Sequence, residues 1–191
     1  MKTTGLWLLP ALAIVAGCSS QKEEKPAQPT QLTFHEEMKN DVDLHADEVW
    51  EIGNSAIGDK AGIDASKMTD AKWDELAMRA DKVQQAALRI AMMDPIVVAK
   101  PGVKIGDEGL VGGHTAAQVQ AEIDKDPQKL RDLANTLARH MGDIASGARK
   151  HDAAAVGPLI DQLDGVCESC HLEFWYPDQK EEVERILGQH V

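Results

Sequence analysis

Two cysteines and a histidine near the C-terminal end of the chain carry the clearest chemical signal, in the motif Cys167-Glu168-Ser169-Cys170-His171. Two thiols three residues apart on a helix can form thioethers with the two vinyl groups of one haem. The histidine that follows then lies directly beneath the iron, and its imidazole nitrogen is a good iron ligand. The motif therefore predicts one haem c per chain, attached to Cys167 and Cys170, with His171 as an axial iron ligand.

The same motif is compatible with two other kinds of site, half of a zinc site and a redox-active dithiol. A zinc site requires another pair of cysteines or histidines at suitable spacing, and the remaining histidines form no such pair. A thioredoxin-like dithiol follows a strand in a βαβ unit, whereas residues 161–166 continue a helical pattern. Haem attachment is therefore the favoured interpretation.

The third cysteine, Cys18, follows an apolar N-terminal segment. The apolar run from Leu6 to Ala16 is too short to span a bilayer and is typical of an export signal. Residues 12–17 and Cys18 resemble the bacterial lipobox, in which the cysteine is lipidated and becomes the mature N-terminus. An ordinary signal peptide followed by an incidental cysteine is the alternative. We expect a lipid anchor on Cys18 and a location in the bacterial cell envelope, facing the periplasm.

The composition indicates one helical domain with appendages. Of the 191 residues, 43% are hydrophobic and only 4% are aromatic, and alanine and leucine are plentiful. A stretch rich in Ser, Gln, Lys, Glu and Pro follows Cys18 and cannot bury enough apolar surface to fold. The expected divisions are a signal peptide (1–17), a flexible tether (18–32), a cytochrome domain (33–177) and a C-terminal tail (178–191).

The net charge of −12 argues against nucleic acid as a partner, because affinity for phosphates comes from Lys and Arg. A basic redox partner protein is the more plausible partner. We expect no substrate-transforming enzyme, because the sequence contains neither a nucleophile elbow nor metalloprotease spacing.

Apolar residues that recur every three to four positions predict four long helices. Thr69 or Asp70 caps the second helix and Pro95 stops it, while Asp126-Pro127 is a typical helix start. Gly157-Pro158 either kinks the last helix or marks its start. The expected elements are helices over about 34–54, 70–94, 127–148 and 153–176, a loop over 94–113 with an extended piece at 96–99, and one or two helical turns over 118–123.

The haem motif lies late on the last of the four predicted helices, continues as Cys-x-x-Cys-His-x-x-Phe and has no earlier counterpart in the chain. This arrangement resembles the class II cytochromes c, the cytochrome c′ family. The resemblance implies that the chain is an all-α, antiparallel four-helix bundle with covalently bound haem near the C-terminus. The chain departs from the family where Phe174 is followed by Trp175 and not by a basic residue. The resemblance leaves open a homodimer formed through the first two helices.

In this family the first helix faces the iron on the side away from the motif histidine. It carries either an apolar residue, which leaves the iron five-coordinate, or a methionine that binds it. Met38 is the candidate second axial iron ligand, and a core-filling role is its alternative. His35 and His45 lie near the same helix face and are further candidates, although a helix-surface histidine is more often solvated. Trp175 and Tyr176 are expected to line or cover the haem pocket, whereas Met78, Met92, Met93 and Met141 fit core positions.

Two functions follow from these alternatives. If Met38 saturates the iron, the expected function is periplasmic electron transfer by a membrane-tethered mono-haem cytochrome. If the iron is five-coordinate, the protein would bind small gases such as nitric oxide or carbon monoxide.

Overall fold

A computed structural model describes residues 31–58 and 62–187. The expected signal peptide, the lipobox with Cys18, most of the tether and the last four residues of the tail lie outside the described residues. The described part of the chain contains helices packed together and no β-strand, compatible with a helical bundle. None of its helices is both long and apolar enough to cross a membrane.

The helical segments follow the chain in an order close to the predicted one. The first predicted helix is present in full, but its middle is a π-helical turn, η1, between α1 and α2. The segments are α1 (Phe34–Glu37), η1 (Met38–Val42), α2 (Asp43–Asn54), η2 (Ala65–Lys67), α3 (Asp70–Ala91), α4 (Ala116–Lys125), α5 (Pro127–Arg149), α6 (Ala153–Phe174), η3 (Pro177–Gln179) and α7 (Lys180–Leu187).

Side-chain caps begin the long helices at the predicted positions. The Thr69 hydroxyl accepts a hydrogen bond from the Lys72 amide at the start of α3. Asp126 caps α5 in the same way, and Pro127 occupies the first helical position. Asp152 caps α6, so that this helix starts at Ala153 and continues through Pro158. The alternative in which Gly157-Pro158 marks the helix start is therefore wrong.

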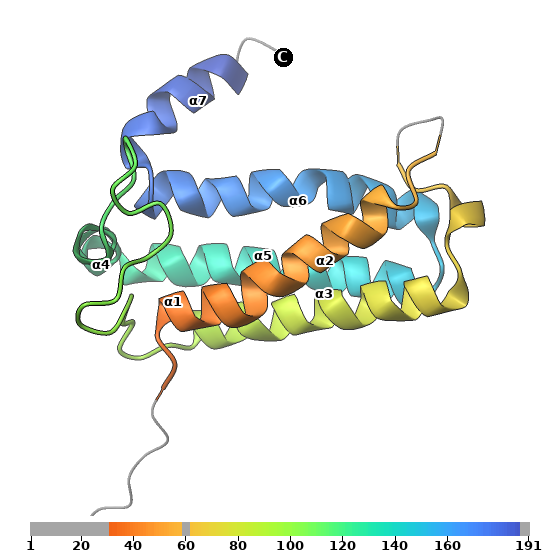
Figure 1. Ribbon diagram of the computed structural model, residues 1–191, viewed down its shortest axis with the longest axis horizontal. Helices are drawn as coiled ribbons and strands as arrows, with labels where there is room; N and C mark the ends of the chain where they lie inside the picture. Colours follow the sequence, from red (N-terminus) through yellow and green to blue (C-terminus); the bar gives the residue numbers. More distant parts are fainter. Residues whose placement is uncertain (1–30, 59–61, 188–191) are drawn as a thin grey trace, which may run out of the picture. The chain divides into compact units, whose positions relative to one another are not determined.

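The four longest helices, α2, α3, α5 and α6, lie side by side (Figure 1). Helix α3 packs along α5, α5 along α6, and α2 against both α3 and α6. Small buried residues on α3 and α5 allow these two helices to approach closely, because alanine adds little bulk between backbones. These residues are Ala77, Ala80, Ala86, Ala87, Ala134, Ala138, Ala145 and Ala148. Larger side chains fill the rest of the core, among them Leu76, Leu130, Met141, Ile144 and Leu163.

The chain between α3 and α4 is the predicted long loop, and it packs against the start of the first helix. The Phe34 amide donates to the Val97 carbonyl over 2.8 Å, and the His35 amide donates to the Val98 carbonyl over 2.9 Å. Ile96 and Val98 are buried, so the predicted extended piece packs without forming a strand. The short element expected over 118–123 is longer than predicted, because a capping box at Thr115 starts α4 two residues earlier.

Two of the four methionines expected in the core are on the surface. Met78 is 45% exposed and Met92 is 72% exposed, whereas Met93 and Met141 are buried as predicted. Met92 follows the last residue of α3, where the chain leaves the bundle, so the helical period no longer directs its side chain inward.

Candidate functional site

A cavity of about 720 Å³ brings the haem-motif residues together with the predicted residues of the first helix. Cys167, Cys170 and His171 line it from α6, and Met38 lines it from the π turn. Its volume is typical of sites for small molecules and cofactors, which measure about 300–1,000 Å³. The sequence therefore identified side chains from two distant segments that share one cavity.

The two cysteines are the expected three residues apart on the inner side of α6. Burial raises the pKa of Cys167 to about 11, with a further contribution from the acidic neighbours Asp164, Asp43 and Glu168. Burial likewise raises the pKa of Cys170 to about 12. Reactive dithiols have lowered thiol pKa values, so these neutral thiols do not resemble a redox-active pair.

The ligand set required for structural zinc does not gather anywhere in residues 31–58 and 62–187. No group of three or more His, Cys, Asp or Glu side chains is arranged there to hold a metal ion. A structural zinc site takes four such ligands in a tetrahedral arrangement. The described residues thus offer no support for the zinc alternative.

One wall of the cavity comes from a regular row of residues along the first helix. The residues of this row follow one another at intervals of four: Phe34, Met38, Val42, Ala46 and Trp50. The residue directly after each of the first four also lines the cavity, namely His35, Lys39, Asp43 and Asp47. A straight α-helix turns by about 100° per residue, so the two ends of this row would point about 160° apart. The π turn holds one extra residue and reduces this angle to about 60°. The turn therefore keeps the whole row facing the cavity.

This π turn was not predicted from the sequence, although the spacing of four along the first helix could have revealed it. A row of side chains with a period of four, continued over more than three turns, cannot stay on one face of an unbroken α-helix. Such π turns frequently occur at functional sites.

The three candidates for the second axial ligand differ in position. Met38 and His35 are both half-buried and both line the cavity. His45 does not line it, and its Nδ1 lies 2.6 Å from Glu48 Oε2. The expectation of a solvated surface histidine is wrong for His45, which is only 4% exposed, because it packs beneath the ion pair of Glu48 and Arg79.

Aromatic side chains surround the motif histidine, as predicted for Trp175 and Tyr176. The ring centroids of His171 and Trp175 are 6.5 Å apart, and those of His171 and Tyr176 are 6.4 Å apart. Phe34 meets Trp175 edge to face, with ring centroids 5.4 Å apart. These rings flank His171 on two sides and restrict the orientations of its side chain, which is 42% exposed.

The long loop supplies a further wall of the cavity that was not predicted from the sequence. Residues 104–107 line the cavity, and the hydroxyl of Tyr176 donates a hydrogen bond to Asp107. Burial, followed by this contact, raises the pKa of Tyr176 to about 12. The His114 amide also donates to the Trp175 carbonyl over 3.1 Å, so the loop is fastened to the end of α6 at two points.

The lining of the cavity fits a haem group. Apolar side chains from three helices could contact a porphyrin face, and they include Val42, Ile90, Leu130, Leu133 and Leu137. Lys39 and Lys104 add two cations that could pair with the two carboxylates of haem, and the aspartates Asp43, Asp47 and Asp107 also line the cavity. Two thiols, an imidazole and a thioether complete a donor set known from c-type haem sites.

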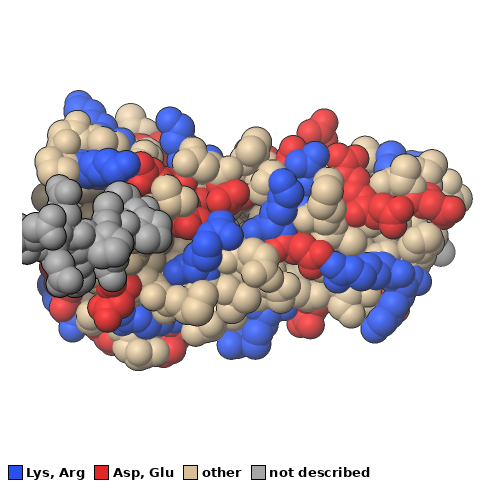
Figure 2. Space-filling model, turned by 90° about the horizontal axis from the view of Figure 1, so that it is seen from below, with Lys and Arg blue, Asp and Glu red and all other residues tan. Residues whose placement is uncertain are grey.

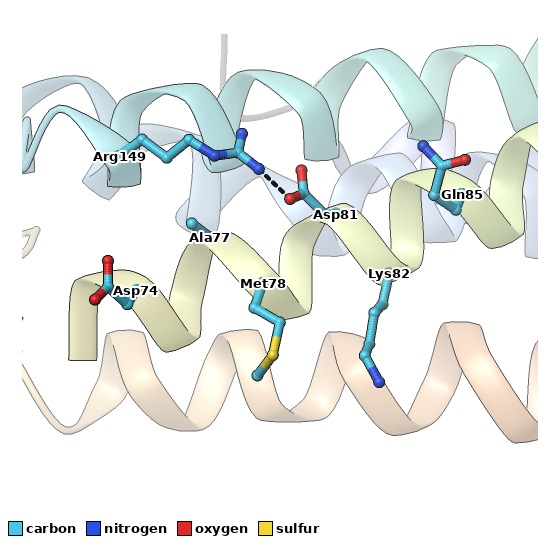
Figure 3. Close-up of a pocket in the computed structure, with 7 residues that line it drawn as sticks. All are labelled: Asp74, Ala77, Met78, Asp81, Lys82, Gln85 and Arg149. Atoms are coloured by element: carbon cyan, nitrogen blue, oxygen red, sulfur yellow. Dashed lines mark hydrogen bonds and ion pairs between the residues drawn. The ribbon is translucent and has the colours of Figure 1, made fainter. Parts of the chain in front are cut away.

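A second hollow, of about 340 Å³, lies on the surface between α3 and α5 (Figure 3). It is shallow and lacks cysteine and histidine, and the ion pair between Arg149 and Asp81 crosses it. Met78, which is 45% exposed, is one of the residues that line it. This hollow shares no residue with the larger cavity and carries no comparable set of ligands.

Basic and acidic side chains are interspersed on the face drawn in Figure 2. No continuous basic surface extends over the described part of this face, unlike the basic patches that bind nucleic acid.

Comparison of the chain with protein-family models, with curated proteins and with solved structures finds no match.

Proposed function

We propose that this protein is a mono-haem c-type cytochrome that transfers electrons, built as an antiparallel four-helix bundle of the class II kind. The observation that carries the proposal is the shared cavity of Cys167, Cys170, His171 and Met38. Two thiols, one imidazole and one thioether from two separate helical segments match the needs of a covalently attached, six-coordinate haem.

Each of these residues has a distinct role in the proposed site. Cys167 and Cys170 would attach the cofactor through thioethers, which would prevent its loss from an exported protein. His171 would bind the iron, and Trp175 and Tyr176 lie beside its ring. Met38 would be the second iron ligand, and a thioether sulfur in this role would raise the reduction potential. Haem, when bound, supplies an iron centre that accepts and releases one electron.

The environment of the cavity supports transfer of electrons more than chemistry on a substrate. Apolar side chains make up much of its lining and would lower the local dielectric around a bound cofactor. Lys39 and Lys104 would pair with the haem carboxylates, in place of the basic residue that the family carries after the final aromatic position. The chain would thus hold the cofactor firmly and leave no site for a substrate on a six-coordinate iron.

The proposed cellular setting comes from the sequence. Lipidation of Cys18 would anchor the protein to a membrane, and residues 19–32 would allow the cytochrome domain to reach its partners in the periplasm. The net charge of −12 favours redox partners with basic docking surfaces.

The second candidate function is binding of a small gas to a five-coordinate haem. Phe34, Val42 and Ile90 give the cavity an apolar wall beside Met38, and such a wall suits a neutral diatomic ligand. In this case Met38 would serve as packing, and the iron would be high-spin.

Optical spectra of the purified full-length protein test both candidates. The electron-transfer proposal expects a low-spin spectrum in both oxidation states and slow binding of carbon monoxide. A high-spin spectrum with rapid carbon monoxide binding would support the gas-binding function instead. A colourless protein, expressed together with haem-attachment machinery, would exclude both.

A further inference from the structure

One arginine on a neighbouring helix forms hydrogen bonds with carboxylates before and within the π turn that carries Met38. Arg89 lies in the last turn of α3, and its guanidinium binds Glu37 through three hydrogen bonds of 2.8–3.1 Å. It also donates a hydrogen bond of 2.7 Å to Asp41. Glu37 immediately precedes the π turn and Asp41 lies within it, so the contacts lie on both sides of Met38.

The burial of Glu37 makes this contact specific. The Glu37 side chain is only 3% exposed, whereas that of Arg89 is 43% exposed. A buried carboxylate without a hydrogen-bonding partner costs free energy, so the Glu37 carboxylate is strongly favoured to stay hydrogen-bonded to the guanidinium. The forked geometry of arginine allows it to bind both oxygens of Glu37 and to contact Asp41 at the same time.

The backbone before the π turn is fastened independently. Thr33 and Glu36 form a capping box, and the amides of Phe34 and His35 donate to carbonyls of the long loop. These contacts all lie before Met38, whereas the hydrogen bond from Arg89 to Asp41 lies after it. If the π turn reverted to α-helix, the residues before it would rotate by about 100° relative to α2, and Met38 would leave the row that faces the cavity.

We propose that Arg89 is a positioning residue, which acts through Glu37 and Asp41 to hold the π turn and to keep the Met38 thioether directed into the cavity. The proposal rests on the proposed function insofar as Met38 binds iron. Its structural part, the stabilisation of the π turn by Arg89, does not depend on the cofactor.

The test compares Arg89→Gln with Arg149→Gln in the full-length protein. Arg149 is a matched control, because it also forms an ion pair with a carboxylate of another helix, Asp81, but far from Met38 along the sequence and in the separate hollow of Figure 3. Hydrogen exchange of the amides of residues 38–43 measures the π turn directly. The high-spin fraction of the ferric haem and the rate of carbon monoxide binding measure the position of Met38.

We expect Arg89→Gln to keep its covalent haem and its helical content. Its exchange over residues 38–43, its high-spin to low-spin ratio and its carbon monoxide binding rate should each rise about tenfold, since charge-assisted hydrogen bonds are strong enough for such a shift. Arg149→Gln should match the wild type in all three. If Arg89→Gln does not fold, Arg89→Lys replaces it, because lysine keeps the charge but not the fork, and the same changes should appear at smaller size.

Two results would overturn the proposal. One is an Arg89 variant with wild-type exchange and spin state, and the other is an equal change in the Arg89 and Arg149 variants, which would indicate general destabilisation. Failure of the proposed function gives a different pattern: the wild-type haem would be absent or high-spin. Hydrogen exchange would then still decide whether Arg89 holds the π turn.

Discussion

Replacement of Met38 by leucine separates the contribution of its packing from the contribution of its sulfur as an iron ligand. Met38 is half-buried at the edge of the core, and leucine has a similar volume, so the exchange should lower the free energy of unfolding by less than about 1.5 kcal/mol. Leucine has no donor for iron. The ferric protein should therefore become high-spin and lose the weak sulfur-to-iron charge-transfer band in the red. Carbon monoxide should bind rapidly, because no internal ligand has to be displaced.

Met141→Leu is the control for this experiment. Met141 is fully buried in the helical core and does not line the cavity, so its replacement removes a sulfur of the same kind at a comparable cost in stability. For both variants, denaturant unfolding gives the change in the free energy of unfolding, and optical spectra give the spin state of the iron. A Met38→Leu protein that stays low-spin would refute the ligand assignment, and His35, which also lines the cavity, would become the candidate.

Three further predictions concern attachment, anchoring and packing. Cys167→Ala should lose one thioether and most of its stable haem, and a variant that retains its full haem content after acid-acetone extraction would contradict the covalent assignment. Cys18→Ser should move the protein from the membrane to the soluble periplasmic fraction, as fractionation and immunoblotting would show; retention would indicate a different anchor. Leu163→Ala removes a fully buried side chain from α6 and should cost about 2–5 kcal/mol in denaturant unfolding, whereas a cost below 1 kcal/mol would mean that the core around it is loosely packed.

Much of the fold could be predicted because local chemistry marks the helix ends. Thr69, Asp126 and Asp152 cap their helices through side-chain hydrogen bonds that depend on residues only three positions away. The apolar periodicity of 3.6 then identified the buried faces of the long helices. Met78 was predicted wrongly from the same periodicity, since a position close to the apolar stripe can still be 45% exposed in the folded protein.

The candidate site was predictable only in part. The haem motif is local in sequence, and the position of Met38 followed from a resemblance to known cytochromes. The π turn left a signal in the spacing of four along the first helix, which was not used. The burial of Glu37 and its contact with Arg89 depend on how two helices meet, and no single segment encodes them. The loop wall formed by residues 104–107 was missed for the same reason, because its contact with Tyr176 joins segments far apart in the chain.

The central claim is that this chain carries one haem bound covalently by Cys167 and Cys170. Intact-mass measurement of the purified protein, before and after acid-acetone extraction, tests it most directly. We predict a mass equal to the mature polypeptide with its lipid plus one haem, and the same mass after extraction. A protein whose mass contains no haem, or whose haem is removed completely by the extraction, would contradict this assignment.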